Sequence, residues 1–315
     1  MRSALWTILQ FSESIDMKDI LLRRRNLLIC KQEKNIRAVC FEADGEQTVA
    51  ITKVGSAPAI TMQYSYNGSL WKDWDLSALP FGGDTKVYVR GVGNAQFGKD
   101  SSNYNRISFG TDAFVYVSGI VESLLNGENE VLVYDFPGIL RNLFYQQTAL
   151  RSAENLHFEV MRTGYSGTAV YAYMFYGCTN LLYAPKVLSI TKFSGGYECA
   201  CMFQGCTSLV KAPELPTTSL YNYVYRYMFQ GCTSLVNAPE LPATTLSKFC
   251  YQNMFYGCTS LKSIRCKAKV TANGATQAWL NGIATSGTFY GYSEYGWGSG
   301  VSGIPTTWTF EELTD

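Results

Sequence analysis

One eight-residue phrase, Met-Phe-x-Gly-Cys-Thr-x-Leu, recurs four times in this chain of 315 residues and constrains the fold more than any other feature. The copies begin at residues 174, 202, 228 and 254, so that successive copies lie 28, 26 and 26 residues apart. A divergent fifth copy occupies residues 143–150. Self-similarity with a period of about 20 to 50 residues is typical of chains that wind into stacked coils, in which each repeat buries its apolar side against the next one.

Within each repeat, the spacing of apolar residues predicts a short strand followed by a helix. After the phrase, Leu209 and Leu215 belong to an extended segment whose leucines are expected to point inward. Leu220, Val224 and Met228 then follow at a spacing of four, which is typical of one face of a helix. The pattern predicts α/β repeats of the leucine-rich type.

Four cysteines share one position of the repeat. They are Cys178, Cys206, Cys232 and Cys258. This alignment allows either a ladder of thiols or metal ligands, or an inward-facing cysteine in each coil that packs as a small apolar side chain with a weak S–H donor. Repetition in every coil favours packing. Cys199 and Cys201 have the most ligand-like spacing, but no histidine accompanies them, so we predict no metal site.

The flanking regions have different patterns. Short runs before the repeats, such as residues 48–52 and 86–90, alternate apolar and polar residues, which predicts a β-sandwich. The segment from Asp16 to Gln32 can form a helix that docks the chain or joins it into an oligomer. The predicted domains are residues 1–34, a helical attachment segment; 35–122, a β-sandwich; 123–270, a leucine-rich-repeat solenoid; and 271–315, a C-terminal cap.

The repeat phrases resemble a known family. Gly-Cys-Thr-Ser-Leu at residues 231–235 and Ala-Pro-Glu-Leu-Pro-Ala-Thr-Thr-Leu at residues 238–246 resemble the BspA-like leucine-rich repeats of bacterial surface proteins and phage-borne proteins. The resemblance covers about residues 143–266, and residues 286–310 resemble the usual end of such arrays. It implies adhesion without catalysis and an extracellular, surface-associated or virion-associated location. Because no signal peptide is recognisable, a cytoplasmic location stays open.

The charge balance excludes several classes of partner. Lysine and arginine number 26 and aspartate and glutamate 25, so the net charge is +1 and only 16 % of residues are charged. Such a chain has no extended field with which to attract nucleic acid or anionic lipid. No apolar run reaches the length of about eighteen residues that membrane insertion needs. We therefore expect a neutral ligand, no nucleic acid and no membrane insertion.

Catalytic signatures are absent from the sequence. The single histidine, His157, has no Cys–His or Ser–His signature around it, and no Gly-rich phosphate loop occurs. Glu214 and Glu240 share a repeat position, and stacked coils would bring them about 5 Å apart, near the spacing of retaining glycosidases. Lys186 holds the same position one coil earlier, so a solvated charge ladder is the simpler interpretation. We predict no catalytic residue, no cofactor and no enzyme activity.

Tyrosine concentrates in the repeats, where residues 134–256 hold 14 of the 22 tyrosines. Repeat positions that vary between copies are expected to face solvent, and an exposed tyrosine can stack on a sugar or a peptide plane. Two tryptophans in the β region allow either a sugar-stacking platform or a place in the core. The candidate ligand-binding residues are Tyr176, Tyr183, Tyr221, Tyr223, Tyr225, Tyr227, Tyr256, Trp71 and Trp74.

These features together predict a non-enzymatic recognition protein. It would bind a neutral glycan or a protein on a cell surface through the tyrosine-rich faces of the coils. The alternative is a structural or assembly subunit, such as a phage tail or appendage component, that docks through the segment from Asp16 to Gln32.

Overall fold

The structure is a computed structural model that describes residues 36–111, 113–127, 138–158, 169–189, 196–268 and 274–314. Its contacts divide the chain into two units, Met1–Ile36 and Arg37–Asp315, and the fold below is that of the second unit. The helix expected between Asp16 and Gln32 lies outside the described residues. Within the described ranges, no helix has the length and apolar character that a membrane crossing requires.

Two β-sheets form the N-terminal part of the second unit. The larger sheet has the strand order β4-β3-β6-β1-β8-β9, and the smaller one has the order β5-β2-β7. The strands are β1 (Val39–Ala43), β2 (Gln47–Val54), β3 (Met62–Ser65), β4 (Lys72–Trp74), β5 (Leu79–Phe81), β6 (Val87–Gly91), β7 (Tyr104–Phe109), β8 (Val115–Ile120) and β9 (Leu150–His157).

The two sheets share one apolar core. Along β2, Gln47, Val49 and Ile51 are buried while Thr48 and Ala50 between them are more exposed, which is the alternation expected of a strand. The ring of Phe41 in the larger sheet lies 6.4 Å from Phe81 and 5.4 Å from Phe109, both in the smaller sheet. The two sheets correspond in part to the predicted sandwich, but the larger sheet continues past residue 122. Its edge strand β9 comes from the repeats and pairs in parallel with β8.

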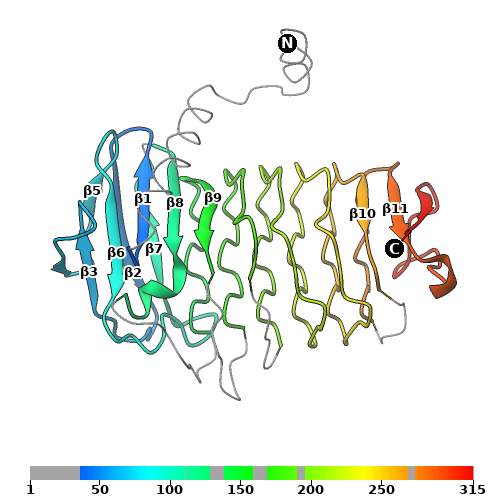
Figure 1. The fold of residues 1–315 in the computed structure, drawn as a ribbon, viewed down its shortest axis with the longest axis horizontal. Coiled ribbons are helices and arrows are strands. Elements are labelled where there is room, and N and C mark those ends of the chain that lie inside the picture. Colours follow the sequence, from blue (N-terminus) through cyan, green and yellow to red (C-terminus); the bar gives the residue numbers. More distant parts are fainter. Residues whose placement is uncertain are drawn as a thin grey trace, which may run out of the picture. The chain divides into compact units, whose positions relative to one another are not determined.

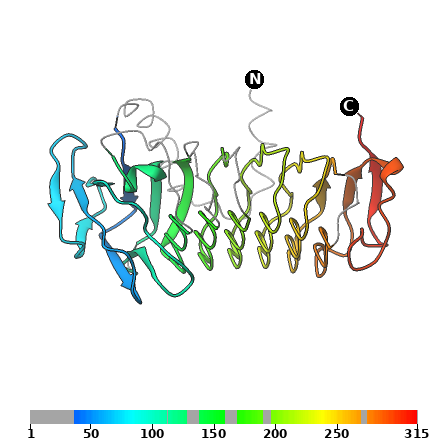
Figure 2. The same ribbon diagram turned by 90° about the horizontal axis from the view of Figure 1, so that it is seen from below.

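The repeats form coils that stack on one another beyond β9, side by side in both views (Figures 1 and 2). Backbone hydrogen bonds from alternate residues join each coil to the next. The Tyr225 N–H donates to the Cys250 carbonyl at 3.0 Å, and the Phe229 N–H donates to the Met254 carbonyl at 2.9 Å. We call residues 138–284 the repeat stack.

The remaining N–H groups of each coil close tight turns within the coil. The N–H groups of Arg226, Met228 and Gln230 each donate to the carbonyl three residues earlier, at 3.1 to 3.2 Å. Every fourth residue has a positive φ, as at Tyr227 (57°) and Gly231 (74°). We call these runs the tandem-turn segments. They comprise residues 138–147, 169–178, 197–206, 223–232, 249–258 and 274–283.

The predicted α/β leucine-rich-repeat solenoid is therefore wrong. Among the described residues the helices are two short 3₁₀ turns, η1 (Val121–Leu124) and η2 (Ser293–Tyr295). Between β9 and β10 (Ser263–Arg265), adjacent coils share isolated bridges such as Tyr183↔Lys211, so the three sheets do not form a solenoid. A chain of four-residue turns repeats its side-chain direction every four residues, which resembles the helical repeat of about 3.6.

Two ladders of identical side chains fill the interior of the repeat stack. Phenylalanine rings of adjacent coils stack at 5.2 to 5.6 Å with planes within 9° of parallel. The ladder comprises Phe144, Phe175, Phe203, Phe229 and Phe255. The four aligned cysteines are fully buried, as the packing interpretation predicted. In the parts that the structure describes, no group of three or more His, Cys, Asp or Glu is placed to hold a metal ion.

A small parallel sheet and a tryptophan cluster lie at the C-terminal end of the repeat stack. The sheet comprises β10, β11 (Thr288–Gly291) and β12 (Thr309–Glu312). Trp297 stacks on the buried ring of Trp279 at 5.6 Å and contacts Phe289 edge-on at 4.8 Å. Trp279 also packs on Tyr251 of the preceding coil at 6.2 Å, so these rings continue the aromatic packing of the coils.

Candidate functional site

The outward positions of the tandem-turn segments form columns that run along the repeat stack. Hydrogen bonds fix the register, because the N–H groups of Asn142, Tyr173, Cys201 and Tyr227 donate to carbonyls of the next coil. We call two adjacent columns the site columns. The first comprises Arg141, Ala172, Ala200, Arg226, Gln252 and Gln277, and the second comprises Asn142, Tyr173, Cys201, Tyr227, Asn253 and Ala278.

A pocket of about 320 Å³ opens on the site columns between two arginines. Arg141 and Arg226 occupy the same column three coils apart, or roughly 15 Å at about 4.8 Å per coil. The two intervening positions of this column are Ala172 and Ala200. Because alanine has no side chain beyond Cβ, these two coils leave the space that the pocket occupies.

Tyrosine rings hold both guanidinium groups in place. The guanidinium carbon of Arg141 lies 4.8 Å from the centroid of the Tyr173 ring. That of Arg226 lies 4.6 Å from the Tyr227 ring and 5.6 Å from the Tyr223 ring. Arg226 Nη2 also donates a hydrogen bond to Tyr227 Oη at 3.1 Å. Cation–π contacts of this kind orient a guanidinium without neutralising it.

The positive charge of the pocket has no ionic partner among the described residues. Neither Arg141 nor Arg226 forms an ion pair there, and the Nε atom of each is buried without a hydrogen-bond acceptor. Burial raises the pKa of Tyr173 to about 12, while both arginines act in the opposite direction. Burial also raises the pKa of the Cys201 thiol, against the same two charges. Both guanidinium groups thus act on the same small volume.

Two ladders of aromatic rings flank the site columns. On one side, Tyr145 and Tyr176 stack at 5.0 Å with planes 6° apart. On the other side, Tyr197 and Tyr223 stack at 4.4 Å with planes 4° apart, and Phe249 extends the stack at 5.3 Å. Stacked rings cover one another's faces, so these ladders present ring edges and rows of hydroxyl groups to solvent.

The predicted tyrosines of the repeats fall into two groups. Five of them reach solvent, with Tyr221 and Tyr256 more than 40 % exposed and Tyr176, Tyr223 and Tyr227 half-buried. The other two, Tyr183 and Tyr225, are 7 % and 2 % exposed and belong to the interior of the stack. Of the five, Tyr223 and Tyr227 contact Arg226 and adjoin the pocket.

The two predicted tryptophans do not form an open platform. Trp74 is buried, and its indole N–H donates to the Ser77 carbonyl at 2.8 Å. The guanidinium carbon of Arg90 lies 4.2 Å from the centroid of the Trp71 ring and covers one face of it. Of the two alternatives that the sequence left open, a sugar-stacking platform or a place in the core, Trp74 therefore takes the place in the core.

Several residues of the pocket were not predicted from the sequence. Arg141, Tyr173 and Tyr197 were not among the candidate ligand-binding residues, although the repeat pattern contains a signal for the position of the pocket. The residue two positions before the first residue of each repeat phrase reads Arg141, Ala172, Ala200, Arg226 and Gln252. The two arginines mark the ends of the pocket, and the two alanines between them line it.

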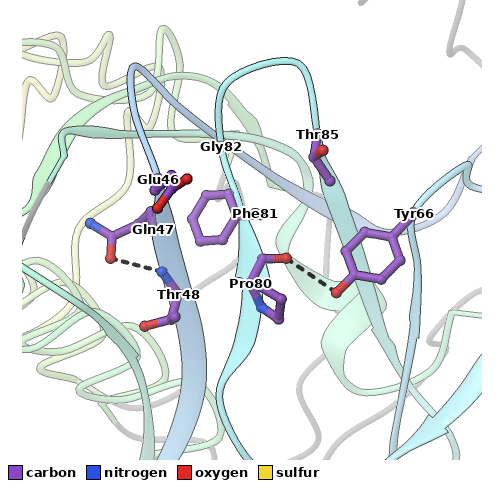
Figure 3. A pocket seen from close by; sticks show the side chains of 8 residues that line it. All are labelled: Glu46, Gln47, Thr48, Tyr66, Pro80, Phe81, Gly82 and Thr85. Carbon is purple, nitrogen blue, oxygen red and sulfur yellow. Dashed lines mark hydrogen bonds between the residues drawn. The ribbon is translucent and has the colours of Figure 1, made fainter.

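A larger pocket, of about 700 Å³, lies over the paired strands β2 and β5 (Figure 3). Glu46, Thr48, Tyr66 and Thr85 line it, and Tyr66 Oη donates to the Pro80 carbonyl at 3.1 Å. Its lining has a single carboxylate, that of Glu46, and neither a thiol nor an imidazole.

The other catalytic candidates lie apart from both pockets. His157 ends β9 and is exposed. The carboxylate of Glu240 forms an ion pair with Lys267 of the next coil at 2.8 Å, which is the contact of a charge ladder. Glu214 donates its N–H to the carbonyl of Lys186, which places these two side chains in neighbouring coils as the sequence predicted.

A comparison of the chain with protein-family models, curated proteins and solved structures finds no match. The resemblance to BspA-like repeats stays a prediction.

Proposed function

We propose that this chain is a recognition protein without catalytic activity, and that it binds a glycan through the repeat stack. The binding surface would comprise the site columns and the two aromatic ladders that flank them, which together we call the outer columns. The observation that carries the proposal is the ladder of Tyr197, Tyr223 and Phe249, whose parallel rings lie on one outer column. A tyrosine hydroxyl both donates and accepts hydrogen bonds, and a glycan presents hydroxyl groups that do the same. Tyr197 and Tyr223 place two such groups side by side on stacked rings 4.4 Å apart, and these two hydroxyl groups can pair with neighbouring hydroxyl groups of a glycan.

Amide side chains extend this surface. Gln204 and Gln230 bond to each other across adjacent coils at 2.5 Å, and Gln252 and Gln277 do so at 2.8 Å. Stacked rings and paired amides are ordered before any ligand arrives. Binding therefore costs little conformational entropy, which favours affinity for a ligand with few apolar groups.

The test is a screen of immobilised glycans, followed by titration with the best ligand. Replacing Tyr197 and Tyr223 together by alanine should weaken binding by at least about tenfold, because truncated anchor residues typically cost more than 1.4 kcal/mol. The matched control is Tyr66→Ala, since Tyr66 is 43 % exposed, close to the 38 % of Tyr197, but lies in the two-sheet region. If the double variant binds as tightly as the wild type, the outer columns are not the binding surface.

The assembly alternative depends on residues outside the described part of the chain. Deleting residues 1–34 should leave glycan binding unchanged if the repeat stack is the binding surface. Loss of glycan binding in this variant would move the binding surface away from the outer columns.

A further inference from the structure

The pocket between Arg141 and Arg226 differs from the rest of the outer columns, because it concentrates positive charge where the other outer positions are mostly neutral. We propose that this pocket binds the carboxylate of an acidic sugar, such as a uronic acid unit of the glycan. The inference rests on the proposed function and adds the chemical class of the ligand.

The charge of the pocket requires an acceptor that the described part of the chain does not supply. Both arginines lack an ion pair among the described residues, and both Nε donors are buried without an acceptor. The exposed Asp100 carboxyl has its pKa lowered first by the Asn103 side chain and only last by Arg141. An unpaired buried donor costs free energy, which an incoming anion would recover.

The geometry favours a carboxylate. A guanidinium presents parallel N–H groups that match the two oxygens of a carboxylate. Arg141 and Arg226 approach from opposite ends of the same column, and the rings of Tyr173 and Tyr227 hold them over the gap. A carboxylate in the gap can therefore accept hydrogen bonds from either arginine.

The size and the walls of the pocket favour a sugar over a small inorganic anion. A volume of about 320 Å³ is near the lower end of the range of pockets that hold small organic ligands. An inorganic anion would occupy only part of this space. The hydroxyl-bearing rings of Tyr173, Tyr197 and Tyr227 line the remainder and can bond to the hydroxyl groups of one sugar unit.

The site also refines the expectation of a neutral ligand. The net charge of +1 means that the chain has no long-range field. Two arginines in a pocket act at contact distance, where screening by salt is weaker than between exposed charges. A single acidic sugar within an otherwise neutral glycan agrees with both observations.

The experiment measures binding of D-glucuronate by titration calorimetry, with D-glucose as the neutral analogue. The expected result is that glucuronate binds at least about tenfold more tightly than glucose, since hydrogen bonds to charged groups typically contribute that much. Arg141→Gln and Arg226→Gln should each remove most of this preference. Ala200→Gln should abolish binding without changing the charge, because it fills the gap with the residue type that the same column carries at Gln252 and Gln277.

The matched control is Arg265→Gln. Arg265 also lies over a tyrosine ring, at 4.9 Å from the centroid of Tyr290, but outside the pocket. This variant changes the net charge by the same amount and should bind glucuronate like the wild type. Equal losses in Arg265→Gln and Arg141→Gln would overturn the proposal, because the effect would then come from net charge alone.

The remaining arms separate this inference from the proposed function. If a polyglucuronate and neutral glycans bind equally well and Arg141→Gln affects neither, the acidic-sugar site is overturned while glycan binding stands. If no glycan binds, both are overturned. If inorganic sulfate or N-acetylaspartate binds as tightly as glucuronate, the pocket recognises an anion and not an acidic sugar.

Discussion

Each repeat cysteine links two adjacent coils through its thiol. Cys206 Sγ donates to the Phe175 carbonyl of the preceding coil at 3.1 Å, and the other three aligned thiols make the same contact at 3.0 to 3.1 Å. The Phe175 carbonyl already accepts the N–H of Cys178 at 3.2 Å. A carbonyl has two lone pairs, so the thiol satisfies the second one where water has no access.

Burial makes these thiols poor nucleophiles. It raises the pKa of both Cys178 and Cys258 to about 12, from the ordinary value of 9.0. Only the thiolate reacts with a disulfide reagent, so a raised pKa and a closed interior both slow the reaction. The nine cysteines among the described residues are all buried.

We therefore predict that an aromatic disulfide reagent at about pH 8 leaves Cys178, Cys206, Cys232 and Cys258 unmodified in the native protein within minutes, as peptide mapping of the labelled protein would show. The same reagent should detect all ten thiols in guanidinium chloride. Rapid modification of any of these four cysteines in the native protein would show that the cysteine ladder is open to solvent.

Some features of the tandem-turn segments could be predicted from the sequence and others could not. The positions of the buried residues were predictable, since Leu220, Val224 and Met228 are all buried. Three positions at a spacing of four fit a helix as well as a chain of turns. On a helix, side chains eight residues apart differ in direction by about 80°, so all three can still lie on one apolar face. A fourth position discriminates between them. Cys232 is also buried, although a helix would have turned it by about 120°.

The backbone of the tandem turns could not be predicted. Positive φ occurs at Tyr223 (63°), Tyr227 (57°) and Cys201 (58°), which are residue types that seldom adopt it. No local sequence signal marks these positions. Hydrogen bonds to the next coil hold them there, so this conformation depends on the stack and not on the segment alone.

The candidate site was predictable only in part, because it too depends on how the coils stack. Repetition identified the columns, and the candidates Tyr223 and Tyr227 do adjoin the pocket. The pocket itself arises from Ala172 and Ala200, which appear in the sequence as unremarkable small residues. Only the register between coils places them between Arg141 and Arg226.

At the element scale, we predict that Gly231→Ala lowers the free energy of unfolding by about 1 to 2 kcal/mol, the cost of a left-handed conformation for a residue with a Cβ. Steric overlap should add little, because a Cβ at Gly231 meets no atom closer than 3.9 Å. Gly231→Asn should cost less, since asparagine tolerates positive φ, as Asn253 does in the next coil. Urea denaturation measures all three proteins.

The control for this prediction is Gly298→Ala. Gly298 has open space around its Cβ position and no left-handed φ, so its substitution should leave stability unchanged or slightly higher. Equal losses for Gly231→Ala and Gly298→Ala would mean that the turn conformation at Gly231 is not the cause.

At the scale of the whole unit, one continuous apolar core joins the two-sheet part to the coils. Phe109 of β7 stacks on Phe144 at 6.4 Å with planes 13° apart, so the phenylalanine ladder begins in the smaller sheet. Pairing of β9 with β8 connects the backbone across the same junction. At the other end of the stack, Trp279 of the last tandem-turn segment packs on Tyr251 at 6.2 Å. The interior thus passes from the first sheet to the tryptophan cluster without a polar break.

This continuity predicts that residues 37–315 unfold in one cooperative transition. Trp74 reports on the two-sheet part and Trp279 on the far end, so in each single-tryptophan variant the fluorescence midpoint in urea should coincide with the circular-dichroism midpoint of the same variant. Phe203→Ala, at the middle of the ladder and fully buried, should lower the unfolding free energy by about 3 to 5 kcal/mol and shift both midpoints together. Val210→Ala, at a side chain that is 45 % exposed, is the control and should shift neither. If Phe203→Ala moves the Trp279 midpoint alone, the coils unfold independently of the sheets, as expected for a repeat array whose coils interact only with their nearest neighbours.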